Sequence, residues 1–95
     1  MLNIEYQGQY KRDLKVVKNR GYKIAELEYV ISLLANGQIL PSNYHDHDLN
    51  DSKRYKGVRE CHIRPNWLLI YYRDNITLRL IRTGTHSDLF DFCLL

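Results

Sequence analysis

The segment between residues 59 and 90 carries side chains that can transfer protons or bind phosphate. Histidine accepts and donates protons near neutral pH, a carboxylate can do so in a suitable environment, and arginine binds phosphate through paired hydrogen bonds. Cleavage of RNA without a metal needs a base for the ribose 2′-hydroxyl, an acid for the departing 5′-oxygen and a cation for the charge on phosphorus. The residues that suit these roles are Glu60, His62, Arg82 and His86.

Three apolar runs position these residues and are separated by two turn signals. The runs are 58–63, 67–73 and 76–83, and the turns are Pro65-Asn66 and Asp74-Asn75. This pattern predicts an antiparallel three-stranded meander. Because side chains alternate between the faces of a strand, Glu60 and His62 share one face, and Cys61 lies on the other. With helices on the Cys61 side, we expect Glu60 and His62 on an exposed face, with Arg82 and His86 at the same end.

The N-terminal half of the chain supplies the helices. Apolar and polar residues alternate over 2–6, which predicts a short strand. Helical periodicity over 9–19 and 24–35 predicts a helical hairpin whose two apolar stripes pack on one sheet face. Segment 39–57 has no clear period, and a loop of this length in a small domain is more often functional than not. Residues 87–90 are predicted to form a short terminal helix.

We therefore predict a single α+β domain over residues 1–95. It has an N-terminal strand, a two-helix hairpin on one sheet face and a three-stranded antiparallel meander. The composition, 44% hydrophobic and 26% charged, is that of an ordinary globular protein, and no apolar run approaches the ~20 residues of a membrane span. The first residues do not resemble a signal peptide, so we expect a cytoplasmic location. Cys61 and Cys93 are predicted to be unpaired thiols.

Basic residues are concentrated in two places, although the formal net charge is only +3. The first group is Lys11, Arg12, Lys15, Lys18, Arg20 and Lys23, and the second is Lys53, Arg54, Lys56, Arg59 and Arg64. Such groups suit a polyanion such as RNA, or they form the solvated face of a helix.

Two further features each allow two interpretations. Trp67 and Phe90 could stack on RNA bases or pack in the core, and the apolar run 68–70 favours packing for Trp67. The histidines and aspartates of segment 45–48 could ligate a metal, but they lack a defined ligand spacing and a cysteine pair. We therefore predict no metal and no cofactor.

Three motifs resemble a known family. They are Asp46-His47-x-Leu49, the segment from Tyr55 to Tyr71 (YKGVRECHIRPNWLLIY) and the segment from Leu80 to Phe90 (LIRTGTHSDLF). Together they resemble the YafQ-like branch of the RelE/ParE toxin superfamily, the messenger-RNA interferases of bacterial toxin–antitoxin pairs. The resemblance implies a RelE-like fold and cleavage of mRNA in the ribosomal A site.

The resemblance also implies roles for individual residues. His47, His62 and His86 match the catalytic histidines, with His86 as the general acid; the general base could be His47, His62 or Glu60. Glu60 and Arg82 match polar residues of the active site. The predicted substrate-binding residues are Trp67, Phe90, Asn66, Lys56 and Arg59. Asn66 stands where the family commonly has aspartate, and an amide can form hydrogen bonds but cannot carry a proton.

The resemblance implies three partners. These are a cognate antitoxin, which is a small DNA-binding protein, mRNA, and the 70S ribosome, whose RNA the basic first helix would contact. No membrane partner is expected. Two alternatives have no need of the histidine set: a ParE-like toxin that inhibits DNA gyrase, and a non-catalytic RNA-binding module.

Overall fold

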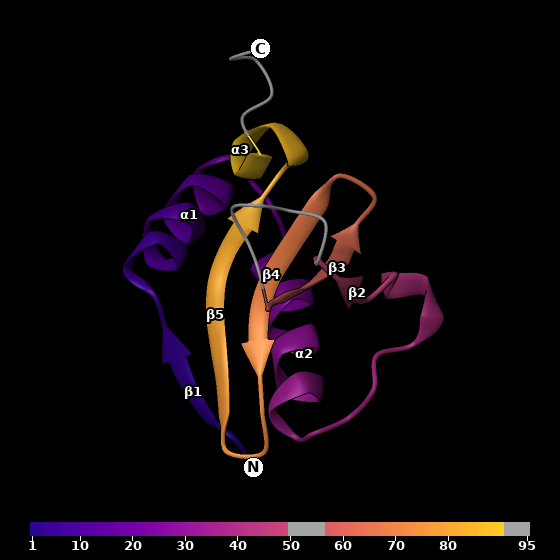
Figure 1. Cartoon of the computed structure of the whole chain (residues 1–95). Helices are drawn as coiled ribbons and strands as arrows, with labels where there is room; N and C mark the ends of the chain where they lie inside the picture. Colours follow the sequence, from indigo (N-terminus) through magenta and orange to yellow (C-terminus); the bar gives the residue numbers. More distant parts are fainter. Residues whose placement is uncertain (50–56, 91–95) are drawn as a thin grey trace.

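A five-stranded mixed sheet is the centre of the computed structural model, which describes residues 1–49 and 57–90. In chain order, the elements are β1 (Asn3–Tyr6), α1 (Gly8–Asn19), α2 (Ile24–Ala35), η1 (Ser42–Tyr44), β2 (His47–Asp48), β3 (Arg59–Arg64), β4 (Trp67–Arg73), β5 (Thr77–Gly84) and α3 (His86–Phe90) (Figure 1). The strand order is β1-β5-β4-β3-β2, and β1 pairs parallel to β5 while the other neighbours are antiparallel.

The predicted α+β fold is confirmed, and the three meander strands begin and end within one residue of the predicted bounds. Two elements were missed, the 3-10 helix η1 and the strand β2, and both lie in the segment predicted to lack regular structure. β2 has two polar residues, both exposed, so it offers no alternation of apolar side chains. Its pairing with the edge of β3 is the observation that defines it.

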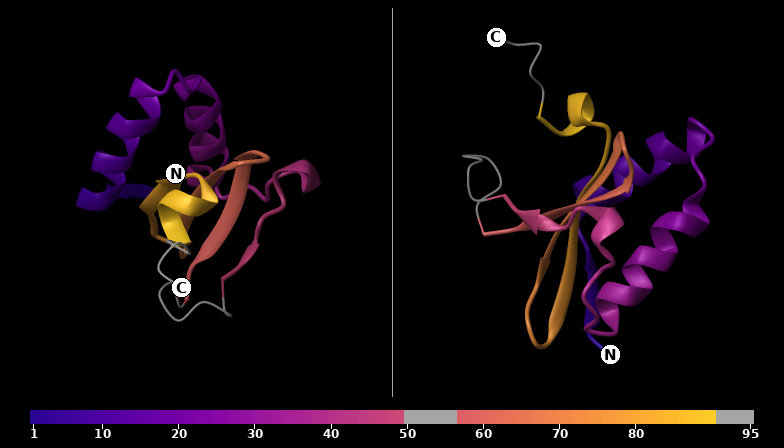
Figure 2. Two further views of the ribbon diagram at one scale, coloured as in Figure 1. Left: turned by 90° about the horizontal axis from the view of Figure 1, so that it is seen from above. Right: turned by 90° about the vertical axis from the view of Figure 1, so that its right-hand side faces the viewer.

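Helices α1 and α2 lie on the same face of the sheet, as predicted (Figure 2). Their buried residues, including Val17 and Leu27, form the main core with Cys61 and Ile63 of β3. Gly21 ends α1 with a φ of 85°, in the left-handed region that a glycine adopts without strain. Burial raises the pKa of the Cys61 thiol, which is unpaired as predicted; Cys93 lies outside the described residues.

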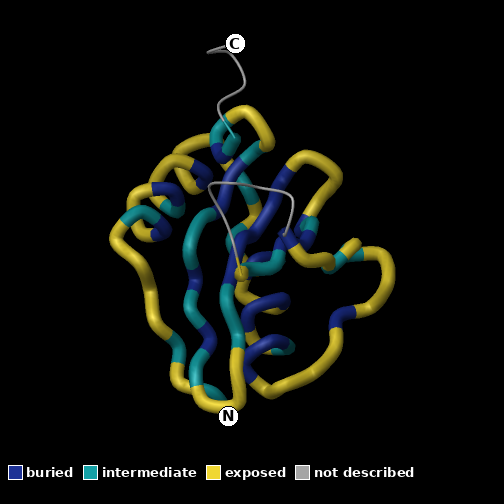
Figure 3. The backbone as a smooth tube through the Cα atoms, in the orientation of Figure 1, coloured by how far each residue is buried: buried dark blue, intermediate teal, exposed yellow. Residues whose placement is uncertain are grey.

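The opposite face of the sheet is partly covered, contrary to the expectation of an exposed face. Leu49, which follows β2, and Leu89 of α3 pack there on Leu68 and Ile70 of β4. Figure 3 shows buried stretches along the middle strands and exposed loops around them. A small second core therefore supports the elements that carry His47 and His86.

No helix among the described residues is long and apolar enough to span a membrane.

Candidate active site

Strands β2 and β3 bring two imidazoles to one buried carboxylate. His47 pairs with Glu60 in the sheet register, and its Nε2 lies 3.3 Å from Glu60 Oε1. The Nε2 atom of His62 lies 3.7 Å from the same oxygen. The Glu60 side chain is only 3% exposed, and its Oε2 atom has no hydrogen-bond partner among the described residues. The predicted proximity of Glu60 and His62 is confirmed, but Glu60 is buried rather than exposed.

The hydrogen bond of His47 to the backbone determines its tautomer. His47 Nδ1 lies 2.7 Å from the carbonyl oxygen of His45, so this nitrogen carries a hydrogen and donates it. A neutral His47 then presents an unprotonated Nε2 to Glu60 Oε1. The contact at 3.3 Å is therefore a hydrogen bond only when a proton lies between these two atoms.

A second set of contacts on the other face of the sheet anchors the segment that carries His47. Tyr71 donates a hydrogen bond to Asp46 Oδ1 at 2.7 Å. The Arg59 guanidinium binds Asp46 at 3.3 Å and Asp48 at 2.5 Å. Burial, followed by the hydrogen bond to Asp46, raises the pKa of Tyr71, which keeps its hydroxyl a donor. Arg59 was predicted to bind substrate; in the structure its guanidinium holds the edge strand β2 through Asp46 and Asp48.

Arg82 reaches the same row of the sheet but is bound by a residue of α1. Ile70 pairs with both Glu60 and Arg82, so the three side chains share one face. Arg82 donates from Nε and Nη2 to Asp13 at 2.7 and 3.0 Å, and the Thr83 N–H donates to the same carboxylate at 3.2 Å. Asp13 was not predicted as a site residue. The one feature of the sequence that could have indicated its burial is its position beside the apolar stripe of α1.

His86 begins α3 at the end of the row that contains His62. His62 pairs with Leu68, which pairs with Gly84, two residues before His86. Strand β4 lies between them, so two strand spacings of ~4.8 Å separate the backbones of His62 and Gly84 by roughly 10 Å. His86 is exposed, and its ring lies 5.2 Å from that of Phe90. His47 and His62 therefore lie on the face of the sheet on which Leu89 of α3 packs, and His86 begins that helix near the end of the His62 row.

The N-terminus of α3 is fixed by Asp88. The Asp88 carboxylate accepts hydrogen bonds from Arg20 at 2.7 Å and from the Thr85 N–H at 2.8 Å, while its own N–H donates to Thr85 Oγ1. The Arg20 contact, followed by those of Thr85, holds the pKa of Asp88 well below its usual range. This arrangement ties α3 to the end of α1 and so positions His86.

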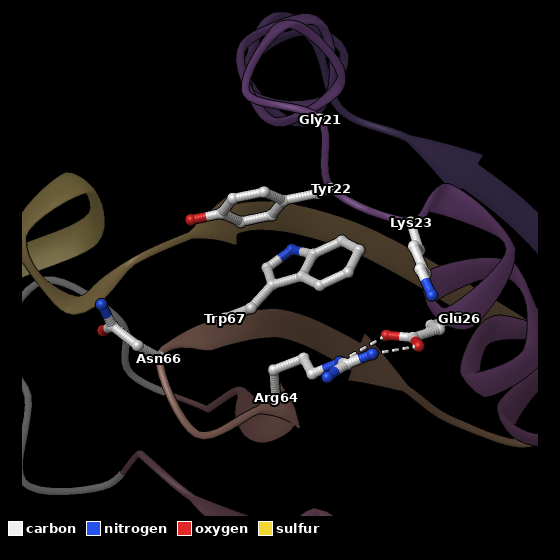
Figure 4. A pocket seen from close by; sticks show the side chains of 7 residues that line it. All are labelled: Gly21, Tyr22, Lys23, Glu26, Arg64, Asn66 and Trp67. Atoms are coloured by element: carbon white, nitrogen blue, oxygen red, sulfur yellow. Dashed lines mark hydrogen bonds and ion pairs between the residues drawn. The ribbon is translucent and has the colours of Figure 1, made fainter.

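Of the predicted substrate-binding aromatic residues, Trp67 packs in the core. It is 3% exposed, donates from Nε1 to Thr83 Oγ1 at 2.9 Å, and meets the Tyr22 ring edge-on at 4.9 Å. Figure 4 shows Trp67 and Tyr22 in a pocket of about 320 Å³, with Asn66 at its rim. Phe90 is half-buried beside the second core. Lys56 lies outside the described residues.

His45 belongs to this cluster and was not predicted as a functional residue. Its ring lies 5.6 Å from that of His62, while its carbonyl group holds His47. The sequence signal was the alternation in 45–48: His45 and His47 lie with His62, whereas Asp46 faces Tyr71. No group of three or more side chains placed to hold a metal ion occurs within residues 1–49 and 57–90.

Comparisons with known proteins find relatives along nearly the whole chain. The family model described as a bacterial toxin of type II toxin–antitoxin systems, YafQ, matches residues 2–91. The mRNA interferase toxin YafQ of Escherichia coli K12 is 44% identical over 89 residues, which cover 93% of this chain and 95% of that protein.

Solved structures show the same fold. YafQ in the crystal structure of the E. coli DinJ–YafQ complex is 42% identical, with a TM-score of 0.86 over 95% of this chain and 99% of that one. A metal-bound toxin from Helicobacter pylori is 39% identical, with a TM-score of 0.86 over 95% of this chain and 100% of that one.

These matches define the class of protein: the chain is a small α+β toxin of a bacterial type II toxin–antitoxin system. Within that class, the chain belongs to the YafQ family, because the family model spans nearly its whole length. The resemblance seen in the three sequence motifs is thereby confirmed.

Proposed function

We propose that the protein is a ribosome-dependent endoribonuclease that cleaves translated mRNA by metal-independent attack of a ribose 2′-hydroxyl. The observation that carries this proposal is the buried Glu60 carboxylate between His47 and His62. A carboxylate taken out of water is costly unless cations or protons compensate it, so this arrangement suits a proton-transfer site. The name mRNA interferase, which the E. coli relative bears, supports the same reaction.

We assign the general base to His62. Both ring nitrogens of His47 are engaged, Nδ1 by the His45 carbonyl and Nε2 by Glu60. Glu60 is too deeply buried to meet a ribose directly. His62 is 22% exposed, and only its Nε2 faces Glu60. Its other nitrogen can accept the 2′-hydroxyl proton while Glu60 stabilises the imidazolium that forms.

The departing oxygen and the phosphorus need two further groups. His86, exposed at the start of α3, protonates the 5′-oxygen. Arg82, oriented by Asp13, supplies positive charge for the pentavalent phosphorus. The 2′-oxygen forms a bond to phosphorus as the bond to the 5′-oxygen breaks, so the products carry a 2′,3′-cyclic phosphate and a 5′-hydroxyl. Phe90 and Asn66 are proposed to contact the flanking nucleotides, whereas Trp67 acts mainly by packing.

The proposed partners follow from charge and from the relatives. Lys11, Lys15 and Lys18 are exposed on α1, and none forms an ion pair with a described residue, so this face can bind ribosomal RNA phosphates. A cognate antitoxin would hold the toxin inactive, as the solved DinJ–YafQ complex suggests. The proposed place of action is the cytoplasm, where ribosomes translate.

Mapping of mRNA 5′ ends after brief induction tests the proposal. The wild type should produce new ends within translated frames. Purified toxin that has been stripped of metal with EDTA and then dialysed should cleave message on ribosomes kept in their usual Mg²⁺ buffer. His86→Ala should abolish cleavage, whereas Ser87→Ala, an exposed change on the same helix, should not. Intact message with an SOS response would contradict the proposal and indicate gyrase inhibition. Loss of cleavage by the EDTA-stripped toxin, restored when a transition metal is added back, would contradict the metal-independent step.

A further inference from the structure

A fourth imidazole stands beside the proposed base and lacks a role in the reaction. The His45 ring meets the His62 ring edge-on, at 5.6 Å and 70°. His45 is exposed, and its ring nitrogens have no hydrogen-bond partner in the part of the chain that the structure describes. Its backbone is engaged instead: its N–H binds the Ser42 carbonyl and its own carbonyl accepts from His47. The backbone is therefore fixed while the ring remains available.

The His45 side chain lines a pocket of about 540 Å³. The residues that line it are Asn43, His45, His62, Ile63, Arg64 and Pro65. No carboxylate is among them, and three of the six side chains can be positively charged. Arg64 uses Nε and Nη2 to bind Glu26, at 2.7 and 2.5 Å, and its side chain remains 56% exposed. The pocket therefore presents hydrogen-bond donors next to the proposed base, and the charge of Arg64 at its edge is paired with Glu26.

These features together suit a phosphate group. Resting on the proposed function, we propose that this pocket is a binding subsite for the RNA phosphate next to the cleaved bond, with His45 as its principal contact. The cleaved phosphate would lie against His62, which lines the same pocket. A neighbouring phosphate of the same strand then falls within reach of His45 and Arg64. Charged hydrogen bonds to phosphate position a nucleic acid without reading its bases.

Binding to ribosomes programmed with an uncleavable message tests the subsite. The message carries a 2′-O-methyl group at the cleaved nucleotide. His45→Asn removes the imidazole but tolerates the left-handed backbone, and it should weaken binding about tenfold at pH 6.5. It should also lower the slope of log affinity against log salt by about 1. His45→Lys should restore both, and Ser42→Ala, an exposed change in the same turn, should alter neither.

Cleavage of unmodified message separates this inference from the proposed function. At saturating toxin, His45→Asn should cleave within about twofold of the wild type, because binding rather than proton transfer is lost. Wild type that leaves message intact would refute the proposed function. Wild type that cleaves, with a folded His45→Asn variant of unchanged affinity and salt slope, would overturn the phosphate subsite alone.

Discussion

Removal of the Asp13 carboxylate should strongly destabilise the protein. Asp13 is 7% exposed and accepts four hydrogen bonds, from Arg82 Nε, Arg82 Nη2, the Thr83 N–H and the Gln9 side chain. Asp13→Ala would leave the Arg82 guanidinium, which is 18% exposed, without this counter-ion. It would also remove an acceptor from the buried Thr83 N–H. Both changes fall on β5, just before the residues that lead to His86.

The size of the effect follows from burial. Breaking a buried ion pair by removing one partner costs about 3–5 kcal/mol, and the partial exposure of Arg82 places this case near the lower end, at about 3 kcal/mol. In a domain of this size, such a loss lowers the melting temperature by roughly 12–24 °C. Asp13→Asn retains an acceptor for Thr83 and should cost about half as much.

Urea unfolding of the wild type, Asp13→Ala, Arg82→Met and the double variant measures the pair directly. We expect Asp13 and Arg82 to be coupled by about 2 kcal/mol, so that the double variant is much less destabilised than the sum of the single ones. A loss below about 1 kcal/mol in Asp13→Ala, or a coupling energy near zero, would refute this reasoning. Arg82 would then not be positioned by α1.

Three further predictions concern the elements around the site. The pKa of Asp88 is lowered in the folded state, so its contribution to stability is complete above pH ~4 and is lost as the pH falls further. Acid unfolding should show this pH dependence of stability, and Asp88→Asn should remove this part of the dependence. Gly84→Ala should reduce cleavage more than Gly21→Ala. A Cβ at Gly84 would lie 2.9 Å from Asp88 Oδ2, whereas a Cβ at Gly21 meets no atom within 4 Å. Equal loss of activity in a cleavage assay would exclude the clash at Gly84. Trp67→Phe removes the hydrogen bond to Thr83 and should cost about 1–2 kcal/mol in urea unfolding, with cleavage by the folded variant retained; abolished cleavage would show a substrate contact instead.

Local patterns predicted most of the fold. Helix α2 begins and ends where its periodicity and Gly37 predict, and the meander has the strands and turns that its apolar runs and turn residues predict. These elements depend on short-range signals, so one sequence suffices for them. Strand β2 depends on pairing with a strand more than ten residues away, and its own two residues carry no such signal.

The candidate site was predicted only in part for a related reason. Alternation in one strand predicted that Glu60 and His62 would share a face, and the structure confirms it. The burial of Glu60 and the partners of Arg82 and Arg59 depend on residues that meet only in the fold. No pattern within β3 or β5 indicates that Asp13 and Asp46 are these partners. The sequence alone therefore does not indicate whether a basic residue binds a substrate or forms an ion pair with a carboxylate of the fold.

The rate at which a Glu60→Gln variant cleaves ribosome-bound message tests the central claim most directly. Glutamine has nearly the same shape but cannot share a proton with His47 or stabilise a charged His62. We predict a folded variant with cleavage at least ~100-fold slower than the wild type at saturating toxin. Cleavage at the wild-type rate, with the same 2′,3′-cyclic phosphate and 5′-hydroxyl ends, would contradict the claim that this carboxylate and its two imidazoles perform the reaction.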